Sequence, residues 1–161
     1  MPNSEKYLEN YSRLESDYLR TNTDKPKIGY ICLRTPLEII ESLDALPLRI
    51  IPREGFDSAD YSTIRSDGCS FCRTIPAVLK TDYYAGLSAV IAGACCDQQR
   101  RVMDTLSRDL EIPVILYGAP RTFESDEDYY LKEMAAAFDK LASKFGGKLS
   151  PDKIRQRLKI R

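Results

Sequence analysis

Short apolar segments alternate with helical segments through most of the chain, and this alternation limits the folds available to it. Extended apolar segments lie at 27–32, 48–51, 88–93 and 113–117. Segments with helical spacing or helix-start signals lie at 35–43, 73–81, 97–110 and 125–145. Such alternation is typical of parallel sheets, because each crossover helix covers a face of the sheet. The sequence therefore predicts an α/β fold: a three-layer, Rossmann-like domain with a parallel sheet flanked by helices.

Two flanking segments complete the predicted organisation. Residues 1–26 carry tyrosines and leucines at helical spacing and then a polar stretch, so we expect an amino-terminal helix and a linker. Residues 27–149 form the α/β lobe. Residues 150–161 are expected to be the start of a truncated helix, with Ser150 as its cap and Pro151 in its first turn.

Composition restricts the class of protein. A chain of 161 residues with 43% hydrophobic residues can bury a core without disulfide bonds. Lys plus Arg and Asp plus Glu are 24 each, so charge gives no reason to expect nucleic acid or a membrane surface as a partner. The longest nearly apolar run, 85–96, is too short to cross a bilayer, and the amino terminus lacks the pattern of a signal peptide. We expect a cytoplasmic protein.

The chain contains no histidine. A Ser-His-Asp or Cys-His catalytic group and a histidine-containing zinc site are therefore excluded within it.

Four of the five cysteines lie in two short clusters, Cys69–Cys72 and Cys95–Cys96. Each cluster precedes a helical segment, and the second directly follows the clearest core strand. Thiolates are soft ligands that can converge at the carboxyl edge of a parallel sheet, which favours iron–sulfur chemistry. A redox dithiol, a zinc site of these four cysteines and unliganded core cysteines remain alternatives. Cys32 is interpreted as a core residue, and Cys95 also fits that interpretation.

Four stretches together resemble the 2-hydroxyacyl-CoA dehydratase and benzoyl-CoA reductase superfamily, specifically the amino-terminal lobe of its cluster-bearing subunits, such as the 2-hydroxyglutaryl-CoA dehydratase D-component. They are the strand–helix–strand at 28–49, Cys69-Ser70-Phe71-Cys72-Arg73, the strand at 89–91 leading to Cys96-Asp97 with Arg100-Arg101, and the segment from Ile112 to Arg121. One departure is Asp44, which stands where relatives usually have glycine.

The resemblance implies a 4Fe–4S cluster bound by three cysteines. Cys69 and Cys96 match the first two ligands, whereas the third lies in a second lobe that these 161 residues do not include. It further implies a 2-hydroxyacyl-CoA substrate, an ATP-driven activator as electron donor, and dehydration through a ketyl radical. An active protein would then be a lyase that needs a second lobe or a partner subunit.

Other interpretations stay open. The chain can be a fragment, one half of a split subunit, or a non-catalytic homologue that keeps the α/β fold without a complete cluster. It can also be a relative of benzoyl-CoA reductase or of the double-cubane cluster reductases, in which Cys72 or Cys95 would serve as an additional ligand. The sequence does not identify the acyl-CoA.

Overall fold

In the part of the chain that the structure describes, the sheet is parallel and has four strands in the order β2-β1-β3-β4. The structure, a computed structural model, describes residues 24–51, 68–119, 127–145 and 147–160. The strands are β1 (Lys27–Tyr30), β2 (Leu46–Arg49), β3 (Leu87–Gly93) and β4 (Val114–Tyr117). The predicted α/β class is confirmed. The predicted amino-terminal helix lies outside the described residues.

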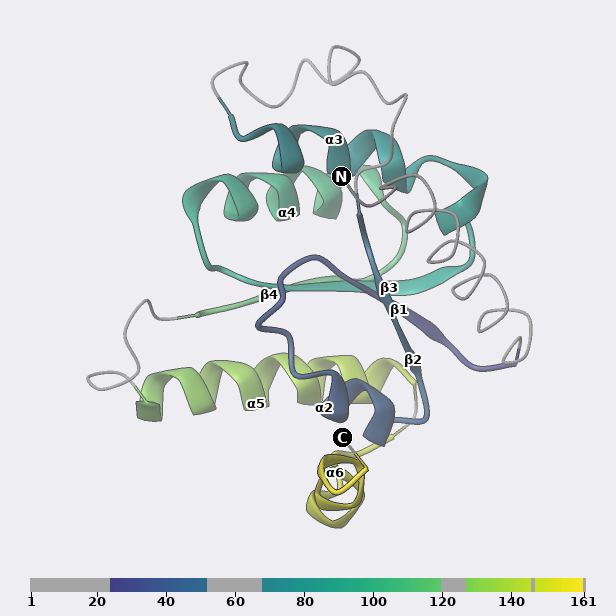
Figure 1. The fold of residues 1–161 in the computed structure, drawn as a ribbon, viewed down its shortest axis with the longest axis vertical. Helices are drawn as coiled ribbons and strands as arrows, with labels where there is room; N and C mark the ends of the chain where they lie inside the picture. The colour runs from purple at the N-terminus through teal and green to yellow at the C-terminus, as the bar shows by residue number, and fades with distance from the viewer. Residues whose placement is uncertain (1–23, 52–67, 120–126, 146, 161) are drawn as a thin grey trace, which may run out of the picture.

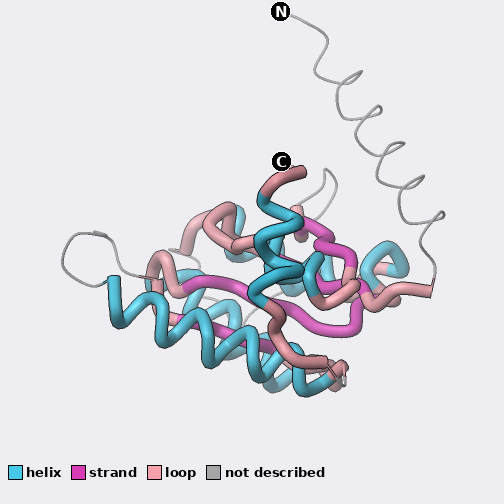
Figure 2. Tube along the Cα trace, turned by 90° about the horizontal axis from the view of Figure 1, so that it is seen from below, coloured by secondary structure: helices cyan, strands magenta, loops and turns pink. Residues whose placement is uncertain are grey.

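Helices cover both faces of this sheet, which gives three layers (Figure 1). On one face lie α3 (Ser70–Leu79) and α4 (Asp97–Asp109); on the other lie α2 (Leu37–Ser42) and α5 (Glu127–Lys144). A short 3-10 helix, η2 (Asp82–Tyr84), leads into β3. The tube in Figure 2 shows the strands enclosed between helices.

Two apolar clusters, one on each face, form the core. The first joins α3 and α4 to the sheet around Ile75, Val90 and Leu106, and the second joins α2 and α5 to it around Ile91 and Phe138. Six of the seven residues of β3 are buried. A strand covered on both faces has no solvent side, and this explains why the sequence of β3 is apolar without alternation.

Strand β2 begins earlier than the sequence indicates. Pro47 lies inside β2, which spans Leu46–Arg49 rather than the predicted 48–51. Among the described strands β2 pairs only with β1, so it is an edge strand. An edge strand tolerates proline because the missing N–H can face away from the ladder.

Helix boundaries near the cysteines also differ from expectation. The helix predicted at 73–81 begins at Ser70 and contains Pro76. α4 begins at Asp97, as its predicted range indicates, with Cys96 as its cap residue. α2 begins at Leu37, two residues later than the predicted range 35–43, with Pro36 as its cap residue. Capping motifs mark a helix start only to within a residue or two, which accounts for these shifts.

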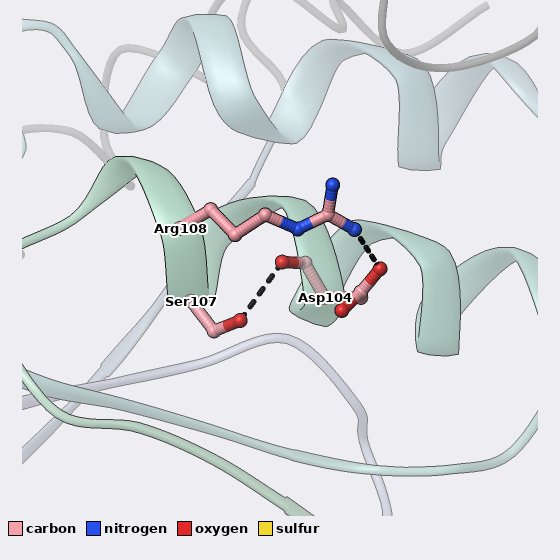
Figure 3. A network of polar contacts seen from close by, with 3 residues as sticks. All are labelled: Asp104, Ser107 and Arg108. Atoms are coloured by element: carbon pink, nitrogen blue, oxygen red, sulfur yellow. Dashed lines mark hydrogen bonds and ion pairs between the residues drawn. The ribbon is translucent and has the colours of Figure 1, made fainter.

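The outer surface of α4 is polar, as its amphipathic sequence predicts. Arg108 forms an ion pair with the Asp104 carboxylate one turn earlier, and the Ser107 hydroxyl donates to the Asp104 carbonyl at 2.8 Å (Figure 3). The buried side of the same helix carries Val102, Met103 and Leu106. This division orients α4, and with it the position of Cys96.

After α5 the chain turns into α6 (Pro151–Leu158), which contacts α2. The Ser150 side chain accepts a hydrogen bond from the Lys153 backbone N–H at 3.4 Å, so the predicted cap is present. Among the described helices, none is long and apolar enough to span a membrane.

Candidate functional site

At the carboxyl ends of two neighbouring strands, the chain continues to opposite faces of the sheet. β1 leads into α2 on one face of the sheet, whereas β3, its neighbour, leads by a short turn into α4 on the other. Open parallel sheets have a crevice at such a point, outside the carboxyl ends of the strands. Cys32 follows β1 by two residues, and Cys95 and Cys96 follow β3 by two and three.

Cys69 and Cys96 occupy equivalent positions at the starts of two adjacent helices. Cys69 is the amino-terminal cap residue of α3 and Cys96 that of α4, and neither side chain makes a capping hydrogen bond. Both thiols are exposed. A helix amino terminus carries a partial positive charge, which favours anionic groups bound there.

Cys72 lies between these two residues. It is buried in the first turn of α3. Burial raises the pKa of the Cys72 thiol to about 12, with further contributions from the neighbouring thiols of Cys69 and Cys96. The two cysteines that sequence analysis singled out are thus both neighbours of a third thiol. In the described part of the chain, no group of three or more His, Cys, Asp or Glu side chains forms a ready metal site.

The adjacent cysteines 95 and 96 have different neighbours. The Cys95 backbone N–H bonds to the Gly93 carbonyl at 2.8 Å, which makes a tight turn at the end of β3. Beyond this turn Cys96 neighbours Cys72, while the Cys95 sulfur lies 2.7 Å from the sulfur of Cys32. Burial raises the pKa of Cys95 to about 12, and its contact with Cys32 adds to that shift.

A pocket of about 460 Å³ opens beside the Cys32–Cys95 pair. Its lining consists of Ile31, Cys32, Leu33, Arg34, Arg49, Phe71 and Cys95. The Nε atom of Arg49 is buried and has no hydrogen-bond partner among the described residues. The pocket is therefore mainly apolar, with guanidinium groups at its wall that suit an anionic or carbonyl group of a ligand.

Cys32 does not occupy the core position expected from the sequence. The residue is only half-buried, contacts Cys95 and lines the pocket. A usable signal was present, because Cys32 and Cys95 each follow a predicted strand and such residues share one edge of a parallel sheet. Arg34 and Arg49 also line this pocket, and the sequence did not single them out.

A sequence model of the 2-hydroxyglutaryl-CoA dehydratase D-component family matches residues 32–161. The chain belongs to this family. The match covers the whole carboxyl edge of the sheet, from Cys32 through Cys69 to Cys96. A search of curated proteins finds no match to the chain.

Family membership establishes a subunit of the 2-hydroxyacyl-CoA dehydratase type. It agrees with the resemblance drawn from the two cysteine motifs. Proteins of this type act on an acyl-CoA together with a partner subunit, as the name D-component implies.

Proposed function

We propose that this chain is the iron–sulfur lobe of a 2-hydroxyacyl-CoA dehydratase, with Cys69 and Cys96 as two ligands of a 4Fe–4S cluster. The observation that carries the proposal is the shared position of these thiols: both are exposed, both start a helix, and both neighbour Cys72. Thiolates are the ordinary ligands of such clusters. The third ligand is proposed to come from a second lobe or partner subunit.

The donor set fits the proposed cluster. Cys69 and Cys96 present sulfur at the amino ends of α3 and α4, where the helix dipoles offset the negative charge of bound thiolates. Neither thiol is committed to a capping bond, so ligation does not cost either helix a cap.

When bound, such a cluster would supply a low-potential electron, delivered by an ATP-driven activator, and an iron that polarises the thioester carbonyl of a 2-hydroxyacyl-CoA. The chain's own residues would bind and position the substrate for radical dehydration. Arg100 and Arg101 are exposed on α4 within two turns of Cys96 and would attract the phosphates of the substrate.

Anaerobic reconstitution tests the ligand assignment. The full chain is incubated with iron, sulfide and a small thiol, and bound iron, visible absorbance and EPR spectra are measured. We expect the wild type to take up iron and sulfide together. Cys69→Ala and Cys96→Ala are each expected to lose most of this uptake, because a thiolate ligand is removed.

Cys32→Ala is the matched control, since it removes a thiol of the same edge that is not a proposed ligand. It is expected to retain iron uptake. Equal uptake by the Cys69→Ala and Cys96→Ala variants and the wild type would contradict the assignment. Absence of uptake by the wild type would favour the alternative, a homologue that keeps the fold without a cluster.

A further inference from the structure

Cys32 and Cys95 form a second pair of thiols, separate from the proposed cluster ligands. Their sulfur atoms lie 2.7 Å apart, although the residues are 63 positions apart in the chain. A disulfide bond is about 2.05 Å long, so only a small movement separates the pair from bonding distance. We propose that Cys32 and Cys95 are a site of reversible oxidation, which forms an intrachain disulfide when the protein meets a hydroperoxide.

Backbone hydrogen bonds hold both sulfur atoms in place. The Thr35 N–H bonds to the Cys32 carbonyl at 3.1 Å and closes a turn, while the Arg34 N–H points at the Cys32 sulfur at 3.4 Å. On the other side, the tight turn from Gly93 to Cys95 and the bond from the Ala94 N–H to the Tyr117 carbonyl at 2.8 Å hold Cys95. The two thiols are thus aligned by the ends of β1 and β3, which are paired strands.

An oxidant can reach this pair. Both cysteines are half-buried and line the pocket of about 460 Å³. The remaining thiols are arranged differently: Cys72 is buried, and Cys69 and Cys96 are exposed at helix starts. Both members of the Cys32–Cys95 pair line the pocket, whereas Cys72 of the C-x-x-C pair is buried.

The proposed reaction balances with one hydroperoxide. One thiol breaks the O–O bond of hydrogen peroxide and becomes a sulfenic acid, releasing one water. The second thiol then displaces the hydroxyl group, so that an S–S bond forms, the S–O bond breaks and a second water leaves. The peroxide accepts two electrons, one from each sulfur, and the two thiol protons leave in the water.

The disulfide would join the ends of β1 and β3 across the switch point. It would link Cys32, in the pocket wall, covalently to Cys95, the residue that directly precedes Cys96. Oxidation at this site would therefore change the geometry of the sheet edge that carries the proposed cluster ligands.

The test uses the reduced, metal-free full chain, so its outcome does not depend on the proposed cluster. The protein is treated with one equivalent of hydrogen peroxide, free thiols are counted, and disulfide-linked peptides are identified by mass spectrometry after alkylation. We expect two of the five thiols to be lost. The main product should be a Cys32–Cys95 disulfide, and treatment with dithiothreitol should restore all five thiols.

Two variants and one control complete the experiment. Cys32→Ser and Cys95→Ser should each abolish the linkage, whereas Cys69→Ser, which changes an exposed thiol, should retain it. The wild-type peptide map decides the question even where a variant does not fold. A main linkage between Cys69 and Cys72, or loss of thiols without any disulfide, would overturn the proposal.

Discussion

Asp44 is the residue whose side chain least suits its backbone conformation. It follows the end of α2 with a φ of 61°, and it is the only non-glycine residue with positive φ in the described part of the chain. Glycine is the usual residue at this position after a helix, because its missing Cβ removes the steric penalty of left-handed geometry. The exposed ion pair between Asp44 and Lys25, at 3.4 Å, offsets little of this penalty.

Replacing Asp44 by glycine should therefore stabilise the protein. We expect Asp44→Gly to raise the free energy of unfolding by about 0.5–1 kcal/mol, since relief of the left-handed strain exceeds the added entropy of the unfolded chain. Urea denaturation measures the change. Lys25→Ala gives the contribution of the ion pair alone. A lower free energy of unfolding for Asp44→Gly than for the wild type would contradict the explanation.

At the residue scale, the cysteines also group by their contacts in the fold and not by the sequence motif in which they occur. Cys95 and Cys96 are adjacent in sequence, yet one contacts Cys32 and the other neighbours Cys72. Adjacent side chains diverge at the end of a strand, so two chemically distinct thiol groups arise from one dipeptide.

At the element scale, the pairing of β3 with β4 depends on a glycine beside the site. Gly93 is paired with Tyr117, and a Cβ on Gly93 would lie 3.0 Å from ring atoms of that tyrosine. The Tyr117 side chain is almost fully buried, so the ring has little room to move. Close packing of strand and ring explains why β3 ends in glycine.

Gly93→Ala should thus destabilise the protein by about 1–3 kcal/mol, because overpacking forces the ring or the strand to shift. In a Tyr117→Leu background the same change should cost less, because the contacting ring atoms are gone. Thermal or urea unfolding of the wild type, the two single variants and the double variant gives the coupling free energy between Gly93 and Tyr117. The matched control is Gly86→Ala, whose Cβ would meet only the end of the Lys27 side chain at 3.5 Å; equal losses at both glycines would contradict this interpretation.

At the scale of the whole molecule, the buried core resists alkaline ionisation. Burial is the main cause that raises the pKa of Tyr117 above its ordinary value of about 10. The folded protein therefore keeps this proton at a pH where the unfolded chain has lost it. The stability contributed by the neutral phenol is complete below about pH 10 and declines as pH rises toward the folded pKa.

Comparison of the wild type with Tyr117→Phe isolates this effect. At neutral pH the wild type should be more stable by about 0.5–1.5 kcal/mol, because the Tyr117 hydroxyl donates to the Arg34 carbonyl at 3.3 Å. Above pH 10 this advantage should shrink. Urea denaturation across the alkaline range measures it, with Tyr129→Phe as a control at an exposed tyrosine; a difference that does not change with pH would refute the explanation.

The sequence by itself determined the α/β fold class of this protein and the approximate positions of most of its elements. Apolar periodicity, proline and glycine act over a few residues, so they predicted β1, β3, β4, α5 and the cap of α6 closely. The same local logic placed each cysteine cluster before a helical segment, although α3 begins three residues earlier than predicted. It was less accurate where tertiary context overrode propensity, as at Pro47, which the free edge of the sheet accommodates.

Only the tertiary structure decided which thiols are neighbours. Strand order depends on hydrogen bonding between segments that are distant in sequence, and no local pattern states which strands pair. Because β1 and β3 pair, Cys32 meets Cys95 and the pocket forms between residues of four different segments. The core assignment of Cys32 was therefore wrong for a physical reason: its environment is formed by a strand that begins 55 residues later.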